Sequence, residues 1–212
     1  MLNATILVPW RLVWLKPRVA IREALEQPSP LLWLAPMASG IVQSMGRAAS
    51  SNVGMRGVGL VTLLGLACVV GTIWGLLQLH LLAGLLWITA RSPTGGRIAF
   101  RRLRTAIALG YTPLGVALFG WIGLSLTLGP ELFADPTVVA IRYGAGAALS
   151  VSALYFGTMA CAIWSVILQV LAVAEVRGAS VLSAAGSLLL AVLLGLVIVV
   201  GVVVAVLLML RR

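Results

Sequence analysis

Long uncharged runs alternate along this chain with short clusters of charged residues. The runs between successive charged clusters hold 20, 34, 26, 32 and 33 uncharged residues. A helix needs about 20 apolar residues to cross a bilayer, and two crossings with a turn need about 40 or more. Each run therefore predicts one membrane-spanning helix. The predicted spans lie near residues 30–46, 58–89, 105–128, 141–173 and 179–210.

The spans are predicted to be helical because their apolar residues are continuous. Strands of a membrane barrel would alternate polar and apolar positions, and lipid leaves only helices or closed barrels as spanning structures. The first run is the least regular, because Pro28, Pro30 and Pro36 restrict its apolar helix to about residues 31–45. A short or re-entrant segment is the alternative there.

Two stretches have the amphipathic pattern of helices that lie in a membrane interface. In the first, Pro17 begins the helix and Pro28 ends it, with Ala20, Ile21, Ala24 and Leu25 on one face. In the second, Gly95 and Gly96 precede a helix with arginines on one face and Ala99, Phe100, Leu103, Ala106 and Ile107 on the other. Both are predicted to place their apolar side in lipid.

Composition supports an integral membrane protein. Hydrophobic residues make up 61% of the 212-residue chain and charged residues 9%, whereas soluble domains carry about a quarter charged residues. The predicted fold class is an all-α, polytopic transmembrane bundle of five spans with one or two interfacial amphipathic helices. One domain is expected over residues 1–212, with a cytoplasmic amphipathic segment at 1–29 and the helical bundle at 30–212.

The charge distribution predicts the topology. The net charge is +10, and the basic residues lie between the apolar runs, which indicates topology determinants and anionic-lipid contacts rather than nucleic-acid binding. Five spans place ten basic residues on one side and five on the other, against nine and six if the first run does not cross. By the positive-inside rule, the N-terminus is predicted in the cytoplasm and the C-terminus outside. The expected location is the inner membrane of a bacterium.

Several short motifs accompany this pattern. Pro17-Arg18 and Gln27-Pro28-Ser29 bound the first amphipathic helix, Gly110-Tyr111-Thr112-Pro113 opens the third span, and residues 171–178 (Leu-Ala-Val-Ala-Glu-Val-Arg-Gly) end the fourth. The chain thereby resembles the Yip-domain family, the Rab-interacting trafficking membrane proteins and their bacterial relatives. The resemblance implies five spans, a cytoplasmic N-terminus and a role in membrane organisation. Eukaryotic members carry a long cytoplasmic region that engages small GTPases, whereas the first span here is predicted to begin at residue 30, so GTPase binding is not expected.

Candidate functional residues fall into two groups. The first is the arginine face of the second amphipathic stretch, which is predicted to contact lipid headgroups: Arg97, Arg101 and Arg104. The second comprises packing or polar intramembrane candidates: Gly71, Gly75, His80, Gly110, Tyr111, Pro113, Glu175 and Arg177. A small-xxx-small pair lets helices approach closely. His80 is interpreted as a hydrogen-bonded packing residue, with ligand or proton binding as the alternative. Glu175 and Arg177 are interpreted as a helix-end anchor or turn ion pair.

No catalytic residues, cofactor or metal site are predicted. The chain has one histidine and five acidic residues, without a phosphate loop, and Cys68 and Cys161 lack the spacing of a zinc site. We expect a non-catalytic membrane organiser or accessory subunit whose partners are anionic lipids and other membrane subunits or a second copy. A small-solute or lipid transporter or channel is the alternative, and an enzyme of lipid chemistry ranks third.

Overall fold

A computed structural model describes residues 8–89 and 98–211, with the backbone alone for residues 8–11. The described part of the chain is all-α. Its helices are α1 (Val8–Leu15), α2 (Pro17–Glu26), α3 (Leu34–Ser50), α4 (Leu60–Thr89), α5 (Phe100–Gly110), α6 (Thr112–Leu128), α7 (Pro136–Tyr143), α8 (Ala145–Arg177) and α9 (Val181–Leu210). Three 3-10 turns join them: η2 (Pro30–Trp33), η3 (Val53–Arg56) and η4 (Gly129–Phe133).

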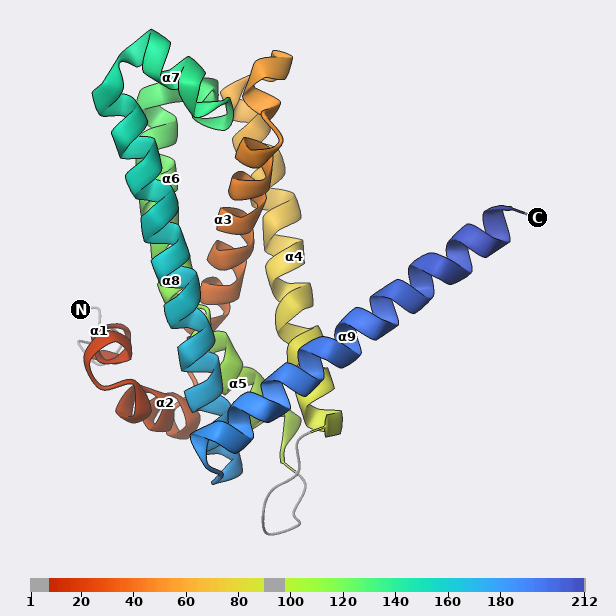
Figure 1. Cartoon of the computed structure of the whole chain (residues 1–212). Coiled ribbons are helices and arrows are strands. Elements are labelled where there is room, and N and C mark those ends of the chain that lie inside the picture. Colours follow the sequence, from red (N-terminus) through yellow and green to blue (C-terminus); the bar gives the residue numbers. More distant parts are fainter. Residues whose placement is uncertain (1–7, 90–97, 212) are drawn as a thin grey trace.

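Four long helices run side by side along the bundle: α3 packs on α4 and α6, and α6 packs on α8 (Figure 1). Helices α1, α2 and α5 gather at one end, and α7 lies at the other end with η3 and η4 (Figure 1). We call the first of these the basic end, because it carries a cluster of arginines: Arg18, Arg22, Arg101, Arg102, Arg104 and Arg177. Helix α9 begins at the basic end and crosses α4 and α8 obliquely (Figure 1).

Four segments of the described chain are long and apolar enough to cross a membrane. They are α4, the segment Phe100–Phe133, α8 and α9. These segments match four of the five predicted spans. The remaining predicted span, near residues 30–46, corresponds to α3. This helix has 17 residues, or about 26 Å of helix, which is slightly less than the ~30 Å of a bilayer core.

The third predicted span is broken at its start. Residues 100–110 form α5, Tyr111 is a turn, and α6 begins at Thr112. Pro113 has no N–H and so cannot continue the helical ladder back to Leu109. The next amide, that of Leu114, donates instead to the Ser165 hydroxyl on α8 at 3.2 Å. The break therefore has a local covalent cause and a tertiary hydrogen bond that accommodates it.

Both predicted amphipathic stretches form helices, α2 and α5. Their apolar faces are buried against protein: Ala20 and Ile21 of α2 pack in one cluster with residues of α5 and α8, and Leu103 and Ile107 of α5 lie fully buried. The expectation that these faces lie in lipid is therefore wrong, because other helices of the chain, including α8, cover them.

Candidate functional site

The basic end brings two of the three predicted headgroup residues together. Arg101 and Arg104 lie one turn apart on α5, with Arg101 exposed and Arg104 half-buried. Arg97 lies outside the described residues. The opposite face of α5 is anchored by buried Leu103, Ala106 and Ile107, so the arginines face away from the bundle core.

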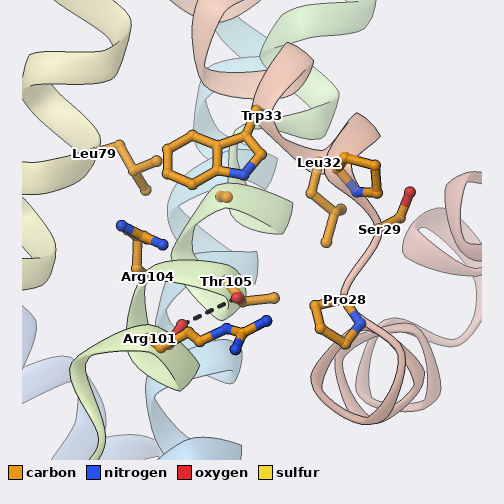
Figure 2. Close-up of a pocket in the computed structure, with 10 residues that line it drawn as sticks. Pro28, Ser29, Leu32, Trp33, Leu79, Arg101, Arg104 and Thr105 are labelled. Carbon is orange, nitrogen blue, oxygen red and sulfur yellow. Dashed lines mark hydrogen bonds between the residues drawn. The ribbon is translucent and has the colours of Figure 1, made fainter.

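A cavity of about 230 Å³ lies beside these arginines. Its walls come from the loop before η2, from η2 itself, from α4 and from α5. The lining residues are Pro28, Ser29, Pro30, Leu32, Trp33, Leu79, Arg101, Arg104, Thr105 and Ala108. Figure 2 shows Arg104 near the Trp33 indole on the Leu79 side of the cavity, and the Arg101 side chain extending toward Pro28 on the other side. The lining of the cavity therefore includes two cationic groups and an aromatic ring.

Trp33 is the centre of an aromatic and cationic contact set. The Arg104 guanidinium lies 4.5 Å from the centroid of its ring, and the His80 imidazole stacks on it with centroids 5.7 Å apart. His80 Nδ1 lies 2.8 Å from the Leu76 carbonyl oxygen, one helical turn earlier. The hydrogen bond and the ring contact fit the first part of the interpretation of His80 as a hydrogen-bonded packing residue, but the residue is exposed rather than buried.

Glu175 and Arg177, at the end of α8, reach to different neighbouring helices. Glu175 accepts a hydrogen bond from Arg22 Nε on α2 and forms an ion pair with it. Arg177 donates to the Ser183 carbonyl and to the Ser187 hydroxyl on α9. Each residue of this predicted turn therefore ties α8 to another part of the basic end.

The turn itself depends on Gly178, which caps α8 with φ +62°. The amide of Ala179 donates to the Ala174 carbonyl at 3.0 Å, the bond that characterises a Schellman cap. A left-handed residue at this position favours glycine. The cap ends α8 and starts α9 within three residues.

Gly71 and Gly75 pack against α3, as their spacing predicts. A Cβ on Gly71 would lie 2.5 Å from Ile41 Cα, and one on Gly75 would overlap the Pro36 carbonyl. Gly40 on α3 faces both glycines and was missed by sequence reasoning. The sequence feature that could have indicated Gly40 is its four-residue spacing from Pro36, which equals the spacing of Gly71 and Gly75 on α4.

Gly110, Tyr111 and Pro113 lie at the break between α5 and α6. Gly110 approaches the Gln169 side chain on α8, where an added Cβ would lie 2.5 Å from Gln169 Cγ. Tyr111 is buried in a cluster that joins residues of α4, α5, α8 and α9. The hydroxyl of Thr112 is buried without a hydrogen-bond partner in the described structure.

The described side chains include no group of three or more His, Cys, Asp or Glu residues that could hold a metal ion. The cavity at the basic end brings together cations, an aromatic ring and small polar groups. This arrangement is suited to binding an anion. Comparison with protein-family models, with curated proteins and with solved structures finds no match for this chain.

Proposed function

We propose that this chain is a non-catalytic integral membrane protein of five spans, an organiser or accessory subunit that packs against another membrane protein or a second copy. In this proposal the basic end faces the cytoplasm and contacts anionic lipid. The relation to the Yip-domain family is part of the proposal. It rests on the sequence motifs, of which one coincides with the Tyr111 break and another with the Gly178 cap.

The observation that carries the proposal is the outer half of α9. The inner half packs on α4 and α8 through Ala184, Leu188 and Ala191. From Leu196 to Leu210 every residue is exposed, and this half of the helix points away from the bundle (Figure 1). It is uncharged and apolar all round, as expected of a helix in lipid or against another membrane helix.

The arrangement of the loops supports five crossings. Gly54 of η3 lies against Pro130 and Phe133 of η4, so the connection after α3 and the connection after α6 meet at one end. The four residues of η2 precede α3, and at ~2.0 Å per residue they add about 8 Å to its length. With α3 as a span, α2 and α5 share the cytoplasmic side.

Co-purification of the full chain in a mild detergent tests the proposal. Gly201→Leu is the informative variant, because nothing in the described chain lies within 4 Å of a Cβ at Gly201. We expect it to fold normally and to lose a stoichiometric partner or self-association that depends on close approach to outer α9. Gly186→Leu is the matched control, since it is equally open but lies on the inner half. A chain that purifies alone as a monomer, with or without Gly201→Leu, would contradict the proposal.

A transporter is the second candidate, and the break between α5 and α6 favours it. Broken helices and polar groups near the midplane are typical of transporter sites, and the Thr112 hydroxyl lies unpartnered at this break in the described structure. Proteoliposomes containing a pH-sensitive dye test for proton-coupled flux. Flux in the native chain that stops in His80→Leu, the variant without the chain's one imidazole, would favour the transporter. Absence of flux with intact partner binding would favour the organiser.

A further inference from the structure

The cavity between η2 and α5 contains two guanidinium groups that no described carboxylate neutralises. Among the described residues the ion pairs are Arg22 with Glu175 and Arg142 with Glu131. The backbone carbonyl of Arg101 accepts a hydrogen bond from the Thr105 hydroxyl at 3.0 Å. Within the described chain, the guanidinium groups of Arg101 and Arg104 donate no hydrogen bond to a protein acceptor. Their N–H donors are available to an anionic ligand.

Trp33 orients one of these cations. Arg104 lies over the Trp33 ring and 5.8 Å from the centroid of Phe100. A cation over the face of an indole is held by the ring's π electrons, and this attraction leaves the guanidinium N–H groups without an oxygen acceptor and able to bond a ligand. Stacking therefore restricts the side chain before a ligand arrives, which reduces the entropy lost on binding.

The opposite wall is also restricted. Pro28 and Pro30 fix their φ angles, and the Ser29 hydroxyl between them accepts a hydrogen bond from the Leu31 amide at 3.3 Å. Figure 2 shows Arg101 extending toward this loop, while Arg104 lies on the Leu79 side of the cavity. The two cations thus approach the cavity from different sides.

The chemistry and size of the cavity select the ligand class. The planar guanidinium fork matches the oxygens of a phosphate group, and two such forks can share its charge. The volume of about 230 Å³ is below the roughly 300–1,000 Å³ of pockets that enclose drug-sized ligands. It fits a small anionic group rather than an entire amphiphile.

We propose that this cavity binds one phosphate group through Arg101 and Arg104, against the Trp33 ring. An anionic lipid headgroup and free inorganic phosphate are the two sources of such a group. Exposed Leu31 and Leu34 are sequence neighbours of the lining residues Leu32 and Trp33, so apolar surface for an acyl chain is available on the same segment. The lipid source rests on the proposed function, because it requires the basic end to lie at a membrane surface.

The test uses the full chain in a neutral detergent and measures its unfolding midpoint during titration. The added ligands are phosphatidylglycerol, phosphatidylcholine with the same acyl chains, and inorganic phosphate. A ligand that binds the native state raises the midpoint with its concentration relative to Kd. The test variant is Arg101→Gln with Arg104→Gln. Its control, Arg18→Gln with Arg102→Gln, removes the same charge from exposed positions at the same end that do not line the cavity.

We expect the cavity variant to bind phosphatidylglycerol about tenfold or more weakly, because charge-assisted hydrogen bonds are lost, while the control keeps the native affinity. A midpoint shift with inorganic phosphate that matches the lipid's, and that is lost in the cavity variant, would support the site and identify the free anion as its ligand. Equal weakening in both double variants, or no shift with either phosphate ligand, would overturn the proposal.

A second variant distinguishes loss of binding from a folding defect. Arg101→Lys with Arg104→Lys keeps both charges and loses the planar forks, so we expect affinity between the native and glutamine forms. Full native affinity in the lysine form would also overturn the proposed geometry. None of these outcomes bears on the partner of α9, whose test is co-purification, so failure of this inference and failure of the proposed function are distinguishable.

Discussion

At the residue scale, glycines set how closely α3 and α4 approach each other. Gly40, Gly71 and Gly75 lie where the two helix backbones touch, and a Cβ at any of them would overlap backbone atoms of the other helix. Backbone cannot move aside as a flexible side chain can, so the helices would have to separate. Close approach of this kind replaces the hydrophobic driving force that lipid does not supply between spans.

Gly75→Ala is therefore expected to lower the free energy of unfolding by about 1–3 kcal/mol, the usual range for overpacking. Gly65→Ala on the same helix is the control, because nothing lies within 4 Å of a Cβ there. That control should be neutral or stabilising by up to about 1 kcal/mol, since alanine favours helix over glycine. The measurement is reversible unfolding in mixed micelles, and equal stability of the two variants would contradict the close contact.

Two amides form a polar pair inside the same interface. Gln43 of α3 and Gln78 of α4 each donate to the other's side-chain oxygen at 3.0 Å, and Gln43 also donates to the Ser39 hydroxyl at 3.3 Å. Because each amide satisfies the other, neither needs a transported ligand to explain its presence between these two helices.

This pairing predicts a non-additive pair of substitutions. Gln43→Leu alone should destabilise by about 1–3 kcal/mol, because it leaves the Gln78 amide unsatisfied. Gln43→Leu combined with Gln78→Leu should be less destabilising than either single change, since both polar groups are removed together. Unfolding in mixed micelles measures all three variants, and strictly additive effects would show that the amides do not depend on each other.

At the element scale, α2 is held on the bundle by a buried apolar face and by one ion pair at its edge. Ala20 and Ile21 are fully buried, whereas the Arg22 side chain is 63% exposed and Glu175 20% exposed. The hydrogen bond to Glu175, and then its charge, raise the pKa of Arg22. The apolar contact is the larger contribution, because exposed ion pairs are screened by water and salt.

Ile21→Ala should accordingly destabilise α2 docking by about 2–5 kcal/mol. A double-mutant cycle of Arg22→Gln and Glu175→Gln should give a coupling much smaller than the Ile21 effect, and this coupling should decrease with added salt. Limited proteolysis near Gln27 reports release of α2 from the bundle. A coupling larger than the Ile21 effect would reverse this ranking of the two contacts.

At the scale of the whole molecule, the direction of each helix determines which loops share a side of the membrane. Single cysteines at Ser51 and Pro136 should react with impermeant reagent from outside, and those at Gln27 and Arg102 only after the membrane is opened. All four positions are exposed, and the background is Cys68→Ala with Cys161→Ala. Reaction of the cysteines at positions 51 and 102 from the same side would contradict five spans, because one predicted span, α4, lies between these positions.

The sequence predicted elements well where the cause is local. Apolar run length predicts the extents of α4 and α9 to within about two residues, and proline bounds α2, because helical hydrogen bonds join residues four apart. Helix α8 begins later than predicted, after Gly144 with φ +85°, and continues to Arg177. The break at Pro113 was less clear, since the arginine-rich α5 and the apolar α6 are separated by one turn residue. The cavity was not predictable: Trp33, Leu79 and Arg101 come from separate helices, and their meeting depends on how those helices cross.

By itself, the sequence determined an all-α chain with long apolar helices, two amphipathic helices and glycines suited to close packing, because composition and periodicity act within each element. Only the tertiary structure decided that Gly40 is the partner of Gly71 and Gly75, and that Glu175 bonds to Arg22, 153 residues away. It also decided that the faces of α2 and α5 cover protein and that outer α9 leaves the bundle. Apolar side chains are satisfied equally by lipid and by another helix, so hydrophobicity alone cannot choose between these neighbours, whereas shape and polar pairing can.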